Sequence, residues 1–241
     1  MELIDLQVAI IYSSSKDADT TASDIAEANN VRCQAYQSEV KDSTAIEATL
    51  QQIAKDFGKL DIVVANAGIA SHHPAEDYTN EQWSEIMKVN LDGAFYTAQA
   101  GARIFKTQGS GNLIFTASVS AILVNVPQKQ AAYNASKAGL VQLARCLSVE
   151  WVDFCRVNCV SPGFIATDML SVHPEEWREK WFQMIPAQRL CDPYELKGVS
   201  KALPLVFAVA DLVQAYVFLA SDASSYMTGG NLVIDGAYTL P

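Results

Sequence analysis

The sequence contains no glycine before Gly58. In open α/β sheets, a glycine-rich turn between the first strand and the first helix lets the backbone approach the pyrophosphate of a dinucleotide. The N-terminal part of this sequence therefore cannot form a phosphate-binding loop of that type. No later segment replaces it, and the first residues, Met1–Leu6, are too few and too acidic to do so.

Positive charge and long apolar runs are also scarce. With 17 basic and 27 acidic residues the chain carries a net charge of −10, which disfavours contact with nucleic acid or anionic membranes. The longest apolar run, near Ala202–Ala210, contains a proline and is too short to span a bilayer. Met1–Leu6 lacks the basic region of a signal peptide. We therefore expect a cytoplasmic protein without nucleic-acid or membrane partners.

Residues with the spacing of metal ligands are missing as well. The five cysteines are scattered and odd in number, which is typical of free thiols in a reducing compartment. His72 and His73 precede a proline, His173 lies far along the chain, and no further ligand stands at metal spacing. We predict solvated histidines and no metal site. Trp177 and Trp181, four residues apart, are predicted to pack a substrate lid.

What the sequence does contain is an alternation of strand-like and helix-like segments. Half of the residues are hydrophobic and 18% are charged, as in one soluble domain over residues 1–241. Continuous apolar runs separated by helical spacing predict an α/β fold, a parallel sheet covered on both faces. The expected strands are Val8–Tyr12, Val31–Tyr36, Leu60–Ala65, Asn112–Ala117, Arg156–Val160 and Asn231–Asp235, and the expected helices include Asp17–Asn29, Thr44–Phe57, Asn80–Lys106 and Ala131–Val152.

The segment Tyr133-Asn-Ala-Ser-Lys137 places a tyrosine and a lysine on one expected helix. Residues four apart leave the same face of a helix, with side chains about 5–6 Å apart. A tyrosine hydroxyl normally titrates at about 10, and a neighbouring ammonium favours the phenolate. We therefore expect Lys137 to lower the pKa of Tyr133 toward neutrality, so that Tyr133 exchanges a proton with a carbonyl or alcohol oxygen.

Polar residues follow several of the expected strands. Asn66-Ala-Gly68, Ser118 and Ser161–Thr167 all stand at strand ends, and Asn90 lies inside the helix expected between two of them. The carboxyl ends of parallel strands meet at one edge of a sheet, and open α/β sheets bind their ligands there. These residues and the tyrosine–lysine pair therefore predict one active site.

This combination resembles the short-chain dehydrogenase/reductase family, from about Val8 to the C-terminus. The stretch Phe115–Lys137 is similar to the fungal polyol dehydrogenase branch, which contains NADP-dependent mannitol and arabinitol dehydrogenases and sorbose reductases. The resemblance implies a Rossmann-like, doubly wound parallel sheet. It also implies an NADP(H)-dependent oxidoreductase that interconverts a secondary alcohol and a ketone, with a small polyol or ketone as substrate and a homo-oligomeric assembly.

The resemblance assigns roles to four catalytic residues. Tyr133 would be the general acid and base, and Lys137 would lower its pKa and hold the nicotinamide ribose. Ser118 would orient the substrate oxygen, although Ser120, two residues on, is an alternative hydroxyl. Asn90 would anchor a proton-relay water, or alternatively would only satisfy a backbone carbonyl within its own helix.

The resemblance also implies a set of cofactor-binding residues. Asn66 and Gly68 would lie against the adenosine side of the cofactor, and Ile165 and Thr167 against the nicotinamide carboxamide. Glu39 would contact the adenine. Tyr133 and Lys137 would touch the nicotinamide ribose, so that they serve both chemistry and binding.

The choice of NADP over NAD comes from the end of the first expected strand. An NAD site places an acidic residue there to accept the ribose hydroxyls. Here the strand ends in Tyr12-Ser-Ser-Ser15-Lys16, with no acid before Asp17. Hydroxyls and a lysine suit a 2′-phosphate better, so we expect NADP.

The chain departs from the family pattern at two places. Val8–Tyr12 matches the second family strand, so the first βα unit and its Thr-Gly-x-x-x-Gly-x-Gly loop are expected to be missing. Because that strand is central, its loss would leave Val8–Tyr12 and Leu60–Ala65 with unpaired inner edges, unless the two pair directly. Val199–Gln214 is expected to be an insertion, and a translated short intron is one hypothesis for it; a misplaced start codon would explain the upstream difference.

Two alternatives to the hypothesis of an active enzyme stay open. One is a catalytically inactive family member that acts as a binding or scaffold subunit through the helices Asn80–Lys106 and Ala131–Val152. The other is a mis-predicted gene product that does not fold. The retained tyrosine–lysine pair favours the enzyme.

Overall fold

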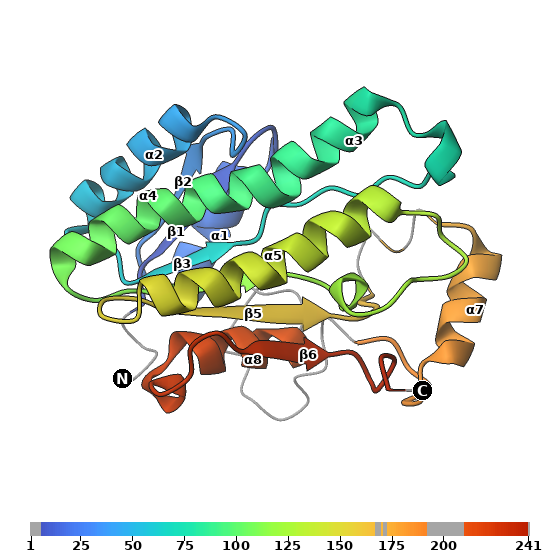
Figure 1. Cartoon of the computed structure of the whole chain (residues 1–241). Coiled ribbons are helices and arrows are strands. Elements are labelled where there is room, and N and C mark those ends of the chain that lie inside the picture. Colours follow the sequence, from blue (N-terminus) through green and yellow to red (C-terminus); the bar gives the residue numbers. More distant parts are fainter. Residues whose placement is uncertain (1–5, 167–169, 171–172, 192–209, 241) are drawn as a thin grey trace.

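The computed structural model describes residues 6–166, 170, 173–191 and 210–240. Strands and helices alternate along the chain as the apolar pattern predicts (Figure 1). The strands are β1 (Val8–Tyr12), β2 (Cys33–Gln37), β3 (Ile62–Ala65), β4 (Asn112–Thr116), β5 (Arg156–Pro162) and β6 (Asn231–Ile234). The helices are α1 (Ala18–Asn29), α2 (Ser43–Phe57), α3 (Asn80–Met87), α4 (Gly93–Gln108), α5 (Ala131–Glu150), α7 (Glu175–Met184) and α8 (Ala210–Ala220), with short turns η2 (Ala75–Asp77), η3 (Lys88–Asp92), η4 (Val119–Ala121) and η5 (Asp222–Ser224).

The helix ends follow from local side-chain chemistry. Asp42 precedes α2 and accepts hydrogen bonds from the backbone N–H groups of Thr44 and Ala45, which the helix itself leaves without partners. Gly58 ends the same helix with φ of 83°, a backbone conformation that favours glycine. Thr79 and Gln82 form a capping box at the start of α3.

The helix expected over Asn80–Lys106 is interrupted. A π-helical turn, η3, separates α3 from α4, and α4 ends at Gly109 with φ of 82°. Such a turn is common at functional sites because it redirects one side chain out of the regular helical pattern. Here it contains Asn90, which is fully buried.

All strand pairs are parallel, which confirms the α/β class. The strands form two sheets, a two-stranded sheet β1–β2 and a four-stranded sheet in the order β3–β4–β5–β6. Among the described residues no pairing joins β1 to β3, so direct pairing does not close the gap and the inner edges stay unpaired, as predicted.

The four-stranded sheet is covered on both faces. On one face, side chains of α4 and α5 such as Phe105 and Leu140 pack against Leu113 and Phe115 of β4 in the largest apolar cluster. On the other face, α8 contributes Leu219 to a second cluster with β4 and β5. The core of the molecule therefore lies on both sides of β4 and β5.

The two sheets run in the same direction. Val40, just beyond β2, lies against Gly93 at the start of α4, where a Cβ atom would be 3.0 Å from its Cγ2. The backbone N–H of Ile69, beyond β3, donates a hydrogen bond to the side chain of Asn90 in η3, the turn that precedes α4. Both carboxyl ends therefore meet at the same end of α4, and the ligand-binding edge continues from one sheet to the other.

The predicted insertion is only partly visible. Residues 192–209 lie outside the described part of the chain, while the last residues of Val199–Gln214 belong to the beginning of α8. Whether this segment is an insertion stays a prediction.

Candidate active site

Tyr133 lies in the first turn of α5, where its hydroxyl group hydrogen-bonds Ser118. Burial raises the pKa of Tyr133 above its ordinary value, and the Ser118 hydrogen bond only partly offsets this effect. The expectation that Lys137 lowers this pKa is therefore wrong for the protein alone. The lysine ammonium points to a backbone carbonyl, and burial disfavours the phenolate more than Ser118 favours it.

Lys137 lies one turn further along α5 and is only 3% exposed. Its Nζ donates a hydrogen bond of 2.7 Å to the carbonyl oxygen of Thr116 and lies 5.7 Å from the centre of the Tyr133 ring. The predicted proximity of the two side chains is confirmed. Because a buried ammonium loses its hydration, the pKa of Lys137 falls to about 8.

The structure distinguishes between the two candidate hydroxyl groups that follow β4, those of Ser118 and Ser120. Ser118 caps η4 by accepting from the backbone N–H of Ser120 and also reaches Tyr133. Ser120 turns away, since its Oγ donates to Asn125 at 2.6 Å and accepts from Gln130 at 3.2 Å. Only Ser118 therefore contacts Tyr133, while Ser120 belongs to a neighbouring buried network.

Asn90 joins the π-helical turn to two other parts of the site. Its Oδ1 accepts from the backbone N–H of Ile69 at 2.8 Å, and its Nδ2 donates to the Ile69 carbonyl at 2.9 Å and to Ser136 at 3.1 Å. Ser136 in turn donates to the carbonyl of Tyr133. The alternative that Asn90 serves only its own helix is therefore wrong, because its partners lie in the loop after β3 and on α5.

Gly68 borders Lys137, and Asn66 contacts Thr116, the hydrogen-bond partner of Lys137. A Cβ atom at Gly68 would be 3.4 Å from Asn90 Oδ1 and 3.5 Å from Lys137 Nζ, so this glycine borders both groups. Asn66 accepts a hydrogen bond of 2.8 Å from the Thr116 hydroxyl. Six predicted residues, Asn66, Gly68, Asn90, Ser118, Tyr133 and Lys137, are thus connected directly or through Thr116 and Ser136.

Thr116 and Tyr216 are members of the site that the sequence reasoning missed. The Thr116 hydroxyl lies 2.6 Å from the hydroxyl of Tyr216 on α8, and the Thr116 carbonyl holds Lys137. Burial raises the pKa of Tyr216 to about 12. The position of Thr116 at the end of an expected strand was a usable signal, whereas nothing local marks Tyr216, which is brought in by α8.

The remaining predicted cofactor residues lie apart from this set. Glu39, beyond β2, accepts a hydrogen bond of 2.9 Å from Ser13, beyond β1, so both mark the carboxyl end of the two-stranded sheet. Ile165, beyond β5, pairs with Cys191 in an isolated bridge. Thr167 lies outside the described residues.

His72 is less solvated than predicted, whereas His73 and His173 remain partly exposed. The ring of His72 is 4.7 Å from that of His173 and 6.0 Å from that of Trp177, and its Nδ1 is buried without a hydrogen-bond partner. Burial, reinforced by the other histidines, lowers the pKa of His72. The ring of Trp177 on α7 packs against the rings of His72 and His173. Trp181 stacks on Phe164 at 4.7 Å, which agrees with a packing role for the tryptophans.

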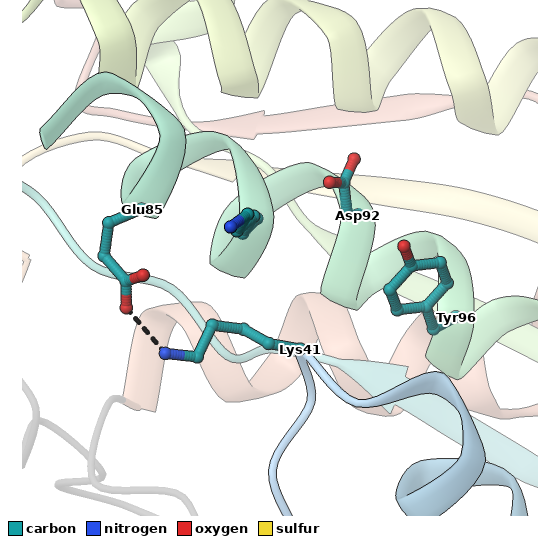
Figure 2. A pocket seen from close by; sticks show the side chains of 5 residues that line it. Lys41, Glu85, Asp92 and Tyr96 are labelled. Carbon is teal, nitrogen blue, oxygen red and sulfur yellow. Dashed lines mark hydrogen bonds and ion pairs between the residues drawn. The ribbon is translucent and has the colours of Figure 1, made fainter. Parts of the chain in front are cut away.

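A separate surface hollow of about 320 Å³ lies between the β2–α2 loop and the α3–α4 segment (Figure 2). It is lined by Lys41, Glu85, Lys88, Asp92 and Tyr96. Figure 2 shows Lys41 pointing to Glu85, which it contacts at 2.7 Å. None of the predicted catalytic residues lines this hollow, so it is distinct from the candidate active site.

Within the described residues no helix is long and apolar enough to cross a membrane, and no group of three or more His, Cys, Asp or Glu side chains is arranged to hold a metal ion. The site instead offers a protonated tyrosine hydroxyl, a serine hydroxyl and a lysine amine. Such groups bind and protonate an oxygen atom of an organic substrate.

Comparison with known proteins supports an enzymatic site of this kind. Residues 4–239 match a family model described as enoyl-(acyl carrier protein) reductase. The chain is 44% identical to a "Probable NADP-dependent mannitol dehydrogenase" of Yarrowia lipolytica, over 97% of this chain and 79% of that protein. It is 42% identical to a sorbose reductase of Schizosaccharomyces pombe, over 96% of this chain and 85% of that protein.

A solved structure extends the similarity to three dimensions. The NADPH-dependent 3-quinuclidinone reductase of Rhodotorula rubra superposes with a TM-score of 0.87 at 38% identity, covering 98% of this chain and 82% of that one. The parallel sheet, the tyrosine–lysine pair on α5 and these similarities lead to one conclusion. The chain belongs to the short-chain dehydrogenase/reductase family, and its Rossmann-like fold is that of an oxidoreductase.

Proposed function

We propose that this protein interconverts a secondary alcohol and a ketone of the polyol and ketose class, with NADP(H) as cofactor. The observation that carries the proposal is the hydrogen bond between Tyr133 and Ser118, with the buried Lys137 one turn away on the same helix. The named activities of the mannitol dehydrogenase and sorbose reductase relatives support the substrate class.

In the reductive direction Tyr133 acts as the general acid. Because its pKa is raised, its hydroxyl is protonated at neutral pH and donates its proton to the ketone oxygen as the carbon is reduced. In the oxidative direction the same oxygen takes the proton back. Ser118 donates or accepts a hydrogen bond at the same substrate oxygen and so fixes the carbonyl relative to Tyr133.

Lys137 and Asn90 support this proton transfer. Lys137 has three N–H donors, and its one hydrogen bond within the described residues goes to Thr116. Two donors remain to bind ribose hydroxyls beside Tyr133. Asn90 holds the loop after β3 through Ile69 and positions a water that returns the proton to Tyr133 from solvent.

The residues around Lys137 fit NADP. When bound, NADPH supplies the hydride. On the adenosine side of the cofactor, Gly68 would keep the space beside Lys137 and Asn90 free of a side chain, and Asn66 would present its amide at the same edge. Ile165 and Thr167 would hold the nicotinamide carboxamide on the opposite side.

The adenosine end would lie along the two-stranded sheet. Glu39 would contact the adenine, and the hydroxyls of Ser13–Ser15 with Lys16 would bind the 2′-phosphate, since the segment Ser13–Lys16 contains no acid of its own. NADPH and NADH titrations followed by nucleotide fluorescence test this preference. Saturable binding of NADPH but not NADH is expected, whereas tighter binding of NADH would contradict the assignment.

The catalytic proposal is tested by replacing Tyr133 with Phe. The change removes the hydroxyl and keeps the ring, so turnover of ketoses and polyols should fall by at least about 10²-fold while the fold is retained. Tyr226→Phe is the matched control because Tyr226 is fully exposed. A Tyr133→Phe protein that turns over normally would rule out the mechanism.

We also propose that copies of the chain assemble through α3–α4 and α5, in the cytoplasm. Trp83 on α3 is 42% exposed and Val149 on α5 is 75% exposed, which supports an apolar contact there. Light scattering of the wild type and of Val149→Lys tests it. A lower mass for the variant is expected, and a monomeric wild type would contradict it.

A further inference from the structure

The loop between η4 and α5 has an inverted burial pattern. Val124 is 81% exposed and Val126 is 41% exposed, whereas Asn125 between them is only 3% exposed. The removal of apolar surface from water does not explain a buried amide between two exposed valines. Because an amide loses its hydration on burial, Asn125 should make specific hydrogen bonds in exchange.

The side chain of Asn125 lies at the centre of a buried hydrogen-bond network. Its Oδ1 accepts from Ser120 Oγ at 2.6 Å and from Gln130 Nε2 at 3.0 Å. Gln130 Nε2 also donates to Ser120 Oγ at 3.2 Å, so the three side chains are bonded to one another in a closed ring. This set of Ser120, Asn125 and Gln130 is called here the Asn125 triangle. All three residues are buried, which strengthens each bond.

The Asn125 triangle joins the two segments that contain the catalytic hydroxyls. Ser120 lies in η4, and its backbone N–H donates to Ser118 Oγ at 3.1 Å. Gln130 directly precedes α5 and stands three residues before Tyr133. The triangle therefore connects the same two segments as the hydrogen bond between Ser118 and Tyr133.

Two further contacts fix the same loop. Asn134, directly after Tyr133, donates from Nδ2 to the carbonyl of Leu123 at 2.9 Å. Asn125 also hydrogen-bonds the hydroxyl of Tyr238, beyond β6. Three parts of the chain that are distant in sequence thus meet at Asn125, namely η4, the beginning of α5 and the segment after β6.

Apolar packing of η4 is provided separately. Val119, the residue after Ser118, belongs to an apolar cluster with Ile185 and Tyr238. Apolar contact is non-directional, so it does not fix the direction of the Ser118 hydroxyl. Hydrogen bonds depend on distance and angle, so a closed ring of them fixes the position of η4 relative to α5.

We propose that Asn125 is a positioning residue, which holds η4 against the first turn of α5 and so keeps the Ser118 hydroxyl on that of Tyr133. The inference rests on the proposed function, in which both hydroxyls bind the same substrate oxygen. Asn125 acts through Ser120 and Gln130 and not on the substrate.

Loss of the Asn125 triangle should change the acidity of Tyr133. The hydrogen bond from Ser118 lowers the pKa of Tyr133 against the larger, opposite effect of burial. If η4 moves away, this pKa rises, and the phenolate that accepts the proton of an alcohol forms only at higher pH. Lys137, whose Nζ is 5.7 Å from the centre of the Tyr133 ring, stays in place in the variants that test this effect.

The test is the pH dependence of polyol oxidation by the purified 241-residue chain, with NADP and with mannitol as the first substrate. Asn125→Ala should move the inflection of the rate profile upward by about one pH unit, which lowers the rate at neutral pH by about 10-fold. Gln128→Ala is the matched control. Gln128 is a buried amide in the same loop, but its Oε1 accepts from Trp181 on α7. This control should lose stability and keep the inflection of the wild type.

A purely structural role predicts a different profile. If Asn125→Ala lowers the rate equally at every pH and keeps the inflection of the wild type, the proposal is wrong. Should Asn125→Ala fail to fold, Ser120→Ala decides the question, because it removes one corner of the triangle and keeps the backbone N–H that donates to Ser118. An upward shift in Ser120→Ala supports the proposal, and an unchanged inflection overturns it.

A second readout does not require turnover. The NMR signal of the Tyr133 Cζ atom, assigned by its loss in Tyr133→Phe, reports the hydrogen bond at the hydroxyl. It should move in Asn125→Ala and stay in place in Gln128→Ala. A wild type that is inactive on every polyol and ketose would contradict the proposed function, whereas an unmoved Cζ signal in Asn125→Ala would overturn the positioning role itself.

Discussion

The four-stranded and two-stranded sheets differ in how completely their neighbours cover them. β4 lies between β3 and β5 under helices on both faces, and four of its five residues are buried. Among the described residues β1 has a single neighbouring strand, and none of its residues is fully buried, although it is just as apolar. The comparison teaches that strand-forming sequence does not by itself determine burial. The connected catalytic residues all lie along the well-covered sheet, whereas Glu39, the expected adenine contact, lies at the end of the other.

The largest expected difference comes from matched isoleucine truncations. Ile114 in β4 is fully buried, so Ile114→Ala should lower the free energy of unfolding by about 3–4 kcal/mol through lost burial and a residual cavity. Ile11 in β1 is only partly buried, so Ile11→Ala should cost about 1–2 kcal/mol. Urea denaturation of both variants measures the difference, and equal losses would show that the two sheets are equally well packed.

The next effect depends on pH and on Lys137. Its pKa in the folded protein is about 8, below the ordinary value of 10.5. As pH rises from 8 toward 10.5, the folded state has released this proton while the unfolded state still binds it, so the free energy of unfolding should rise by up to about 3 kcal/mol. Lys137→Met should lack this rise. Parallel pH profiles of the two proteins, measured by urea denaturation, would refute the buried-lysine account.

A smaller effect is expected at Asn90, which links η3 to the loop after β3. Asn90→Ala leaves both backbone groups of Ile69 without their partner and should cost about 2 kcal/mol. The comparison on the two-stranded side is Ser13→Ala, which removes the exposed hydrogen bond to Glu39 and should cost less than about 0.5 kcal/mol. Thermal denaturation ranks the two, and a reversed order would contradict the burial argument.

An effect smaller than that of Asn90→Ala is expected at the N-terminus of α2, the helix that packs against β1. Asp42→Ala removes the acceptor for the N–H groups of Thr44 and Ala45 and should cost about 1 kcal/mol. Asp42→Asn keeps a capping oxygen and is the control, with most of the stability retained. If both variants unfold at the same midpoint as the wild type, the cap contributes nothing to this region.

Strands and helices were predictable because their signals are local. The expected strand Val8–Tyr12 has the bounds of β1, and the helix expected over Ala131–Val152 is α5 with its C-terminal end shifted. The interruption of the long helix at η3 was not predictable, because it depends on Asn90 finding Ile69 and Ser136. Apolar spacing contains no information about such a partner.

Much of the candidate site was predictable for a similar reason. Parallel topology brings strand ends together, so the sequence alone predicts Asn66, Gly68 and Ser118 near Tyr133. The sequence could not place Tyr216 beside Thr116, and it gave the wrong direction for the pKa of Tyr133. That direction depends on how much water the fold removes from the hydroxyl group.

The sequence by itself determined the order of strands and helices, the tyrosine–lysine spacing on α5 and the family, because each depends on residues close together in the chain. Only the tertiary structure decided that Ser118 rather than Ser120 contacts Tyr133, that Lys137 is buried enough to lower its pKa to about 8, and that β1 and β3 stay apart. These outcomes depend on desolvation and on hydrogen bonds between distant segments, and packing alone establishes both.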